Sequence, residues 1–138
     1  MSGKSSMYYA AAAAMAALAL SVPAASAQPA ASAAVRVSCP ITGGETSGLR
    51  NIAATFTNRS VTVTATVVDD QSGSTRAHFR AIQGRNVVDE ELSSWVDEER
   101  RSVTVQMSAD RPGGVSKVEY WTESSTALTD STHRFCAR

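Results

Sequence analysis

Apolar and polar residues alternate in short runs through the middle of the chain, which is the pattern of β-strands with one buried face. In residues 60–68, valine and alanine alternate with threonine, and residues 101–109 repeat the pattern with Val103, Val105 and Met107. Residues 75–83 form a third run. In this run we expect Ala77, Phe79 and Ala81 to face the core, and Arg76, His78 and Arg80 to face outward.

Segments 35–39, 51–57, 115–122 and 131–138 also have the character of strands. Turn-forming residues separate the runs at 69–74, 84–86 and 110–114, and residues 41–48, with three glycines, are expected to form a loop. The short connection at 58–60 predicts that its two flanking runs pair as a hairpin. About seven strands spaced in this way predict an antiparallel β-sandwich in an all-β chain.

Residues 87–99 do not alternate, and they favour one short helix instead. Val88, Leu92, Trp95 and Val96 fall at i, i+4, i+7 and i+8, so a helix would present them on one face. Asn86 would cap that helix, with acidic residues in its first turns. We therefore expect Trp95 to be buried in the core.

The first 27 residues have the layout of a cleaved signal peptide. Lys4 precedes an apolar run over residues 7–20, and Ala25, Ser26 and Ala27 supply a small-x-small cleavage site. The apolar run is too short for a transmembrane helix, which needs about 20 apolar residues. We expect a flexible lead at 28–34, a single domain at 35–138, and a secreted protein, extracellular or periplasmic, of bacterial type.

Two cysteines, Cys39 and Cys136, lie near the two ends of the expected domain. Exported proteins meet an oxidising environment, so an even pair of cysteines predicts a disulfide. The bridge would tie the first strand to the last. In immunoglobulin domains the bridge joins internal strands, so we expect a sandwich that is immunoglobulin-like in architecture only.

Charge is nearly balanced. Loss of Lys4 with the signal peptide would leave twelve basic and thirteen acidic residues. Nucleic-acid binding requires a strongly basic face, so we expect no nucleic-acid partner. After cleavage we also expect no transmembrane segment.

Catalytic chemistry has few candidates, because His78 and His133 are the two histidines of the chain. No catalytic motif singles out one serine as a nucleophile. The acidic runs 89–91 and 97–99 lack the interleaved glycine and asparagine of calcium loops. We therefore predict no catalytic residue, no metal site and no cofactor.

One aromatic pair suggests a binding surface. Tyr120 and Trp121 are adjacent in an expected strand, so their rings lie on opposite faces of the sheet. Trp121 shares its face with Glu119 and Lys117, which predicts that Trp121 is partly exposed while Tyr120 packs inside. Trp121, Glu119 and Lys117 are the candidate binding residues.

Three functional hypotheses remain open. The first is a small non-enzymatic binding or interaction module for an unknown protein or cell-envelope ligand. The second is an extracellular enzyme inhibitor, and the third is a small hydrolase built around His78 or His133. A β-sandwich hosts all three, so the fold class does not choose among them.

Overall fold

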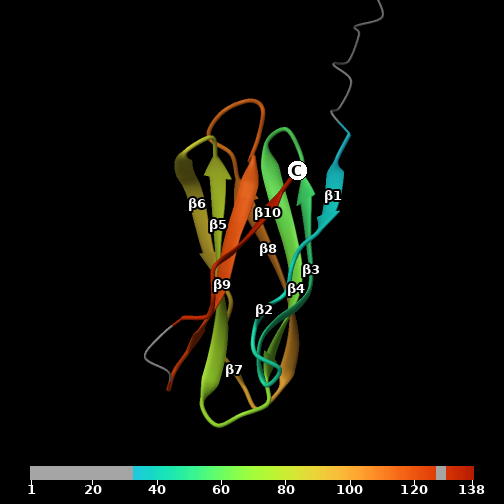
Figure 1. Cartoon of the computed structure of the whole chain (residues 1–138). Coiled ribbons are helices and arrows are strands. Elements are labelled where there is room, and N and C mark those ends of the chain that lie inside the picture. Colours follow the sequence, from blue (N-terminus) through green and yellow to red (C-terminus); the bar gives the residue numbers. More distant parts are fainter. Residues whose placement is uncertain (1–32, 127–129) are drawn as a thin grey trace, which may run out of the picture. The chain divides into compact units, whose positions relative to one another are not determined.

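The computed structural model describes residues 33–126 and 130–138, which form two antiparallel β-sheets packed together (Figure 1). The expected signal peptide and residues 28–32 of the expected lead lie outside the described residues. The strands are β1 (Val35–Ser38), β2 (Thr42–Gly43), β3 (Ser47–Phe56), β4 (Ser60–Asp69), β5 (Ser74–Gln83), β6 (Asn86–Leu92), β7 (Val96–Asp97), β8 (Arg100–Ser108), β9 (Lys117–Ser124) and β10 (Arg134–Ala137).

The predicted β-sandwich is confirmed. Sheet A has the strand order β1-β3-β4-β8, with β2 paired to the start of β3. Sheet B has the order β10-β9-β5-β6, with β7 paired to the start of β5. The predicted hairpin is β3–β4, in which Phe56 pairs with Val61. Its turn is closed by Thr57, whose Oγ1 accepts a hydrogen bond from the Ser60 N–H at 2.9 Å.

The core lies between the sheets and is made mainly of small and branched side chains. Every second residue of β4 and β5 faces inward and is buried, as the alternation predicts. Tyr120, Phe56 and Phe79 are the largest of the fully buried side chains. A valine-rich sequence forms this core because branched Cβ atoms pack well on pleated surfaces.

The prediction of a helix at 87–99 is wrong, because the segment forms β6 and β7, which are connected by residues 93–95. Helical spacing of the apolar residues is coincidental, because the strand has an irregularity where it pairs with Ala81 and Ile82 of β5. The acidic residues are held by partners a helix would not offer. Glu90 forms an ion pair with Arg80 of β5, and Asp89 accepts backbone hydrogen bonds.

The loop expected at 41–48 contains the short strand β2, which pairs Thr42 with Leu49 and Gly43 with Gly48. The pairing depends on glycine, because a Cβ at Gly48 would lie 2.3 Å from the Thr42 carbonyl oxygen. Among the described residues, β2, β6 and β7 are thus strands in addition to the seven expected.

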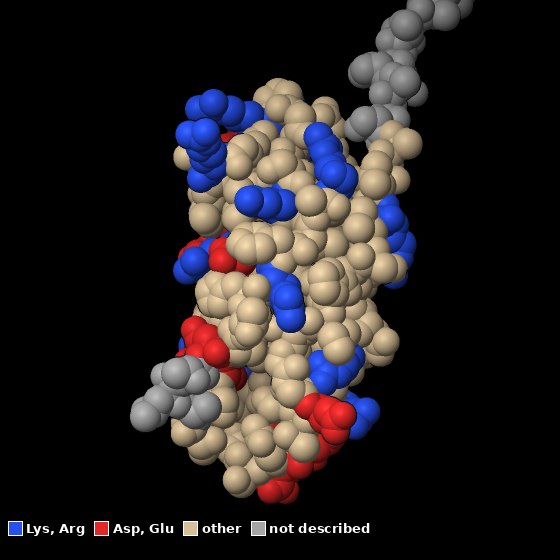
Figure 2. Space-filling view, viewed as in Figure 1, with Lys and Arg blue, Asp and Glu red and all other residues tan. Residues whose placement is uncertain are grey.

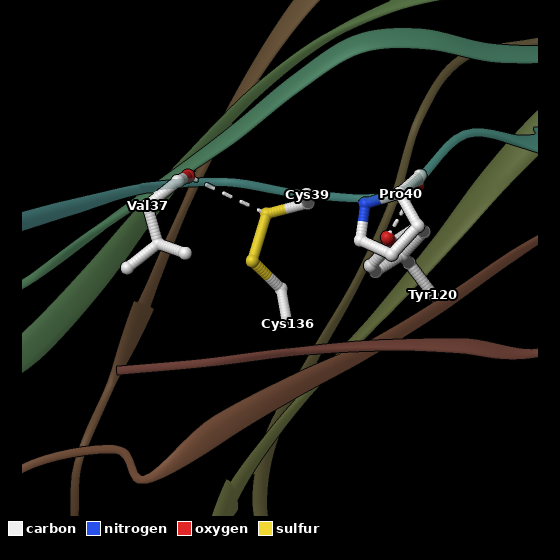
Figure 3. The surroundings of a disulfide bond; sticks show 5 residues. All are labelled: Val37, Cys39, Pro40, Tyr120 and Cys136. Atoms are coloured by element: carbon white, nitrogen blue, oxygen red, sulfur yellow. Dashed lines mark hydrogen bonds between the residues drawn. A yellow bond between two sulfur atoms is a disulfide. The ribbon is translucent and has the colours of Figure 1, made fainter.

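The predicted Cys39–Cys136 disulfide is present (Figure 3). Cys39 directly follows β1 of sheet A and Cys136 lies in β10 of sheet B, so the bridge joins the two sheets. Beside it, the Tyr120 hydroxyl donates a hydrogen bond to the Pro40 carbonyl at 2.5 Å. Burial raises the pKa of Tyr120 to about 12, because the charged phenolate would lose its solvation.

A buried carboxylate, Asp69 at the end of β4, fixes the opposite end of the sandwich. Its Oδ1 accepts a hydrogen bond from the Thr75 hydroxyl at 3.0 Å, and its Oδ2 accepts one from the Glu98 N–H at 3.1 Å. Glu98 has a φ of 48° in the turn between β7 and β8, an uncommon conformation for a non-glycine residue. Asp69 therefore ties sheet A to sheet B and stabilises a strained turn.

We expect Asp69→Ala to lower the free energy of unfolding by about 2–4 kcal/mol, because it leaves a buried hydroxyl and an N–H without their acceptor. Chemical denaturation followed by circular dichroism measures the change. Its neighbour Asp70 is a matched control, since its partner Arg100 is exposed. Asp70→Ala should change stability by less than about 1 kcal/mol. Equal losses in the two variants would contradict the role assigned to Asp69.

Candidate functional site

The outer face of sheet B carries alternate residues of β5 and β9, which point away from the core. The register pairs Arg76 with Glu123, His78 with Trp121, and Arg80 with Glu119. Each pair lies side by side on the same face, because directly opposite residues of antiparallel strands share a face. We call this surface the sheet B outer face.

Trp121 lies at the centre of this face in a stack of three rings. The His78 ring is 4.8 Å from the Trp121 ring at 17°, and the His133 ring is 4.1 Å from it on the other side at 9°. The Arg80 guanidinium lies 4.7 Å from the same indole. The prediction that Trp121 is partly exposed is wrong: it faces outward, as expected, but these neighbours leave only 5% of it exposed.

Two glutamates of β9 hold the histidines in place. Glu123 Oε2 lies 2.6 Å from His78 Nε2 and 2.7 Å from Arg76 Nε, while Glu119 Oε1 lies 2.8 Å from His133 Nδ1. The Arg76 guanidinium, followed by His78, holds the pKa of Glu123 below its ordinary value. The stack is thus fixed by charged hydrogen bonds on both sides of Trp121.

A pocket of about 410 Å³ opens beside the stack, between β5 and β6. His78, Arg80 and Trp121 line it from the middle of the sheet. Glu90 and Leu92 line it from β6, and the Leu92 side chain is half exposed. The pocket therefore combines a cation, a carboxylate and apolar surface, a mixture suited to holding a ligand by several contacts at once.

Trp95, expected to be buried, is 39% exposed, and this prediction is also wrong. It lies in the segment between β6 and β7, where the chain leaves the sheet. The Arg76 guanidinium lies 4.5 Å from its ring. Leu92, in the pocket lining, and Trp95, against Arg76, are therefore two large apolar side chains, close in sequence, that remain accessible.

The structure brings two of the three predicted binding residues together. Glu119 reaches the Trp121 stack through His133, whereas Lys117 lies over the ring of Phe135 at 5.0 Å from its centroid. Sequence reasoning missed Arg80 and Leu92 as parts of the site. The alternation in β5 correctly predicted that Arg80 faces outward, but the register between strands was needed to set it beside Trp121.

One polar atom of the site has no partner. Trp121 Nε1 is buried and makes no hydrogen bond. Among the described residues, every other buried side-chain nitrogen or oxygen has a hydrogen-bond partner. A buried donor left unpaired costs free energy. The hydrogen bonds of both imidazoles go to carboxylates.

Within residues 33–126 and 130–138, no group of acidic, histidine or cysteine side chains is arranged to hold a metal ion.

A larger hollow, of about 630 Å³, lies near the ends of β2, β3 and β9. Its hydroxyl groups already bond within the fold: Thr42 Oγ1 donates to the Thr132 carbonyl at 2.5 Å, and Ser131 Oγ accepts from the Thr122 N–H at 2.8 Å. Residues 127–129, next to Asp130 in this lining, are not described. We assign no site to this hollow.

Comparison of the chain with protein-family models, curated proteins and solved structures returned no match. The described part of the chain contains no helix able to cross a membrane. The disulfide is compatible with a secreted protein.

Proposed function

We propose that the protein is a small secreted, non-enzymatic binding module that contacts its ligand through the sheet B outer face. The observation that carries this proposal is a pair of accessible apolar side chains: Leu92, which lines a pocket with Arg80, and Trp95, which lies against the Arg76 guanidinium on the same face. Large apolar side chains accessible in a protein this small are candidates for a binding surface. Tryptophan and arginine are also the side chains most enriched at the energetic centres of protein interfaces.

A protein of the surroundings or of the cell envelope fits this surface better than a strongly charged polymer. Arg76 and Arg80 are matched by Glu123, Glu119 and Glu90. In Figure 2, acidic and basic side chains lie close together near mid-height on the left of the view, the side on which Figure 1 shows β6. Neither sign dominates there, so shape and apolar contact would provide the affinity while the ion pairs provide specificity.

The hydrolase hypothesis receives less support from the same residues. A glutamate that orients an imidazole supplies two of the three members of a catalytic triad. The third member is a nucleophile hydrogen-bonded to the second imidazole nitrogen, and the described hydroxyl groups supply no such bond to His78 or His133. Both rings are also stacked against Trp121, which favours a structural role for the pair.

The test compares retention of envelope and culture-medium proteins on the immobilised protein and on its variants. Trp95→Ala and Leu92→Ser should each weaken binding of a retained partner at least about tenfold, as loss of a central interface residue does. Val35→Ser is the matched control, since Val35 is a similarly exposed apolar residue in sheet A. Partners retained equally by all four proteins would reject the sheet B outer face as the binding surface.

A further inference from the structure

Strand β8 is the longest edge strand of the sandwich, and it pairs on one side only, with β4. An edge strand presents unpaired N–H and C=O groups that attract another strand, so proteins protect their edges. The other edge strands show such protection. β1 and β10 have four residues each and contain Arg36 and Arg134, and β6 carries three consecutive acidic residues.

The direction of the β8 backbone groups follows from two hydrogen bonds at its end. The Ala109 N–H donates to the Arg59 carbonyl on the β4 side, whereas the Ser108 N–H donates to Asp89 Oδ2 on the opposite side. Backbone groups alternate direction along a strand. Ser102, Thr104 and Gln106 therefore direct their N–H and C=O groups away from β4, toward the open edge.

One end of this edge is blocked and the rest is open. Asp89 Oδ2 accepts a hydrogen bond from the Ser108 N–H at 2.9 Å, and Asp89 Oδ1 accepts one from the N–H of the next residue, Glu90, at 2.9 Å. This carboxylate thus closes the corner at which β6 approaches β8. Residues 102–106 have no such cap among the described residues. They contain no charge, and their sequence Ser-Val-Thr-Val-Gln has high β-propensity.

We propose that residues 102–106 of β8 form the interface with a second copy of this chain, in which the two β8 strands pair antiparallel about a two-fold axis at Thr104. Thr104 would then face Thr104 of the second copy, and Ser102 would face its Gln106. In this register every open residue lies in a hydrogen-bonded pair, which gives six hydrogen bonds. A shift of the partner strand by two residues toward Ser108 requires the N–H that Asp89 already holds, and a shift by two residues toward Arg100 sets Val105 opposite Arg101 instead of opposite a valine.

The side chains favour the same register. Val103 and Val105 are only half buried at the edge of the core. In the proposed pair each valine lies opposite the other valine of the second copy, which covers both. Farther out, Arg101 would face Met107, so no like charges meet within the paired segment. Two five-stranded sheets would thereby become one continuous sheet.

The first test measures self-association of the processed protein, as released by an exporting host, by sedimentation over a dilution series. We expect a concentration-dependent dimer. Amide exchange at Ser102, Thr104 and Gln106 should slow as the dimer forms. Thr104→Pro removes an outward N–H that the fold does not use, and should weaken dimerisation at least about tenfold. Thr104→Val keeps that N–H and is the control.

Cross-linking tests the register without relying on proline. Thr104→Cys places two cysteines opposite each other in a hydrogen-bonded pair, at about 5.5 Å between Cα atoms, which suits a disulfide. Gln106→Cys should not cross-link to itself, but should cross-link to Ser102→Cys when the two variants are mixed. A monomer at every concentration would overturn the proposal. Self-linking of Gln106→Cys at the rate of Thr104→Cys would overturn the register.

Discussion

Loss of the Cys39–Cys136 disulfide is expected to lower the free energy of unfolding by about 4–5 kcal/mol. The two cysteines are 97 positions apart, so the bridge removes most of the conformational freedom of the unfolded chain. A net stability of about 5–15 kcal/mol is usual for a domain of this size. The bridge would therefore supply a large share of the total, since the core is built largely from valine and alanine.

Cys39→Ala, Cys136→Ala and the double variant should lose the same amount, because each removes the same bridge. Urea denaturation of the wild-type protein before and after reduction gives an independent value. A melting temperature that does not change on reduction would contradict the expected role of the disulfide.

Trp121→Ala is expected to cost about 3–5 kcal/mol, which is usual for truncation of a buried aromatic side chain. The indole separates two imidazoles, so its loss removes both stacking contacts and opens a cavity on the face of sheet B. Trp121→Phe keeps a ring between His78 and His133 and removes the unpaired N–H, so its loss should be smaller. Chemical denaturation followed by circular dichroism measures all three proteins.

Trp95→Ala is the control for the position of the ring, and should change stability by less than about 1 kcal/mol, since Trp95 is accessible. Acrylamide quenching of the two single-tryptophan proteins should be strong for Trp95 and weak for Trp121. A larger loss of stability from Trp95→Ala than from Trp121→Ala would reverse these assignments.

The sequence predicted the strands in which one face is uniformly apolar, because burial and alternation then agree. The valine–threonine alternation of β4 and the alanine–phenylalanine positions of β5 are such cases. The helix prediction for residues 87–99 was wrong because an irregular strand pair and a break after Leu92 gave apolar spacings that match a helix. Local periodicity cannot identify β6, whose acidic residues are stabilised by groups on β5 and β8.

The site was harder to predict than the fold. Lys117 and Glu119 correctly indicated that Trp121 faces outward. Its burial depends on His78, which is 43 positions away in the sequence and becomes a neighbour only through the register of β5 and β9. Exposure on a sheet face is set by the side chains of adjacent strands, and a single strand does not contain that information.

The bridge between the sheets also determines how the protein responds to tension. A pull applied between the residue before Cys39 and the residue after Cys136 would pass through the sulfur–sulfur bond, not through the strands. The chain between the two cysteines, roughly 330 Å long when extended, would stay folded under that pull. If the protein links two bodies through its ends, it acts as a short covalent tether whose length changes only on reduction.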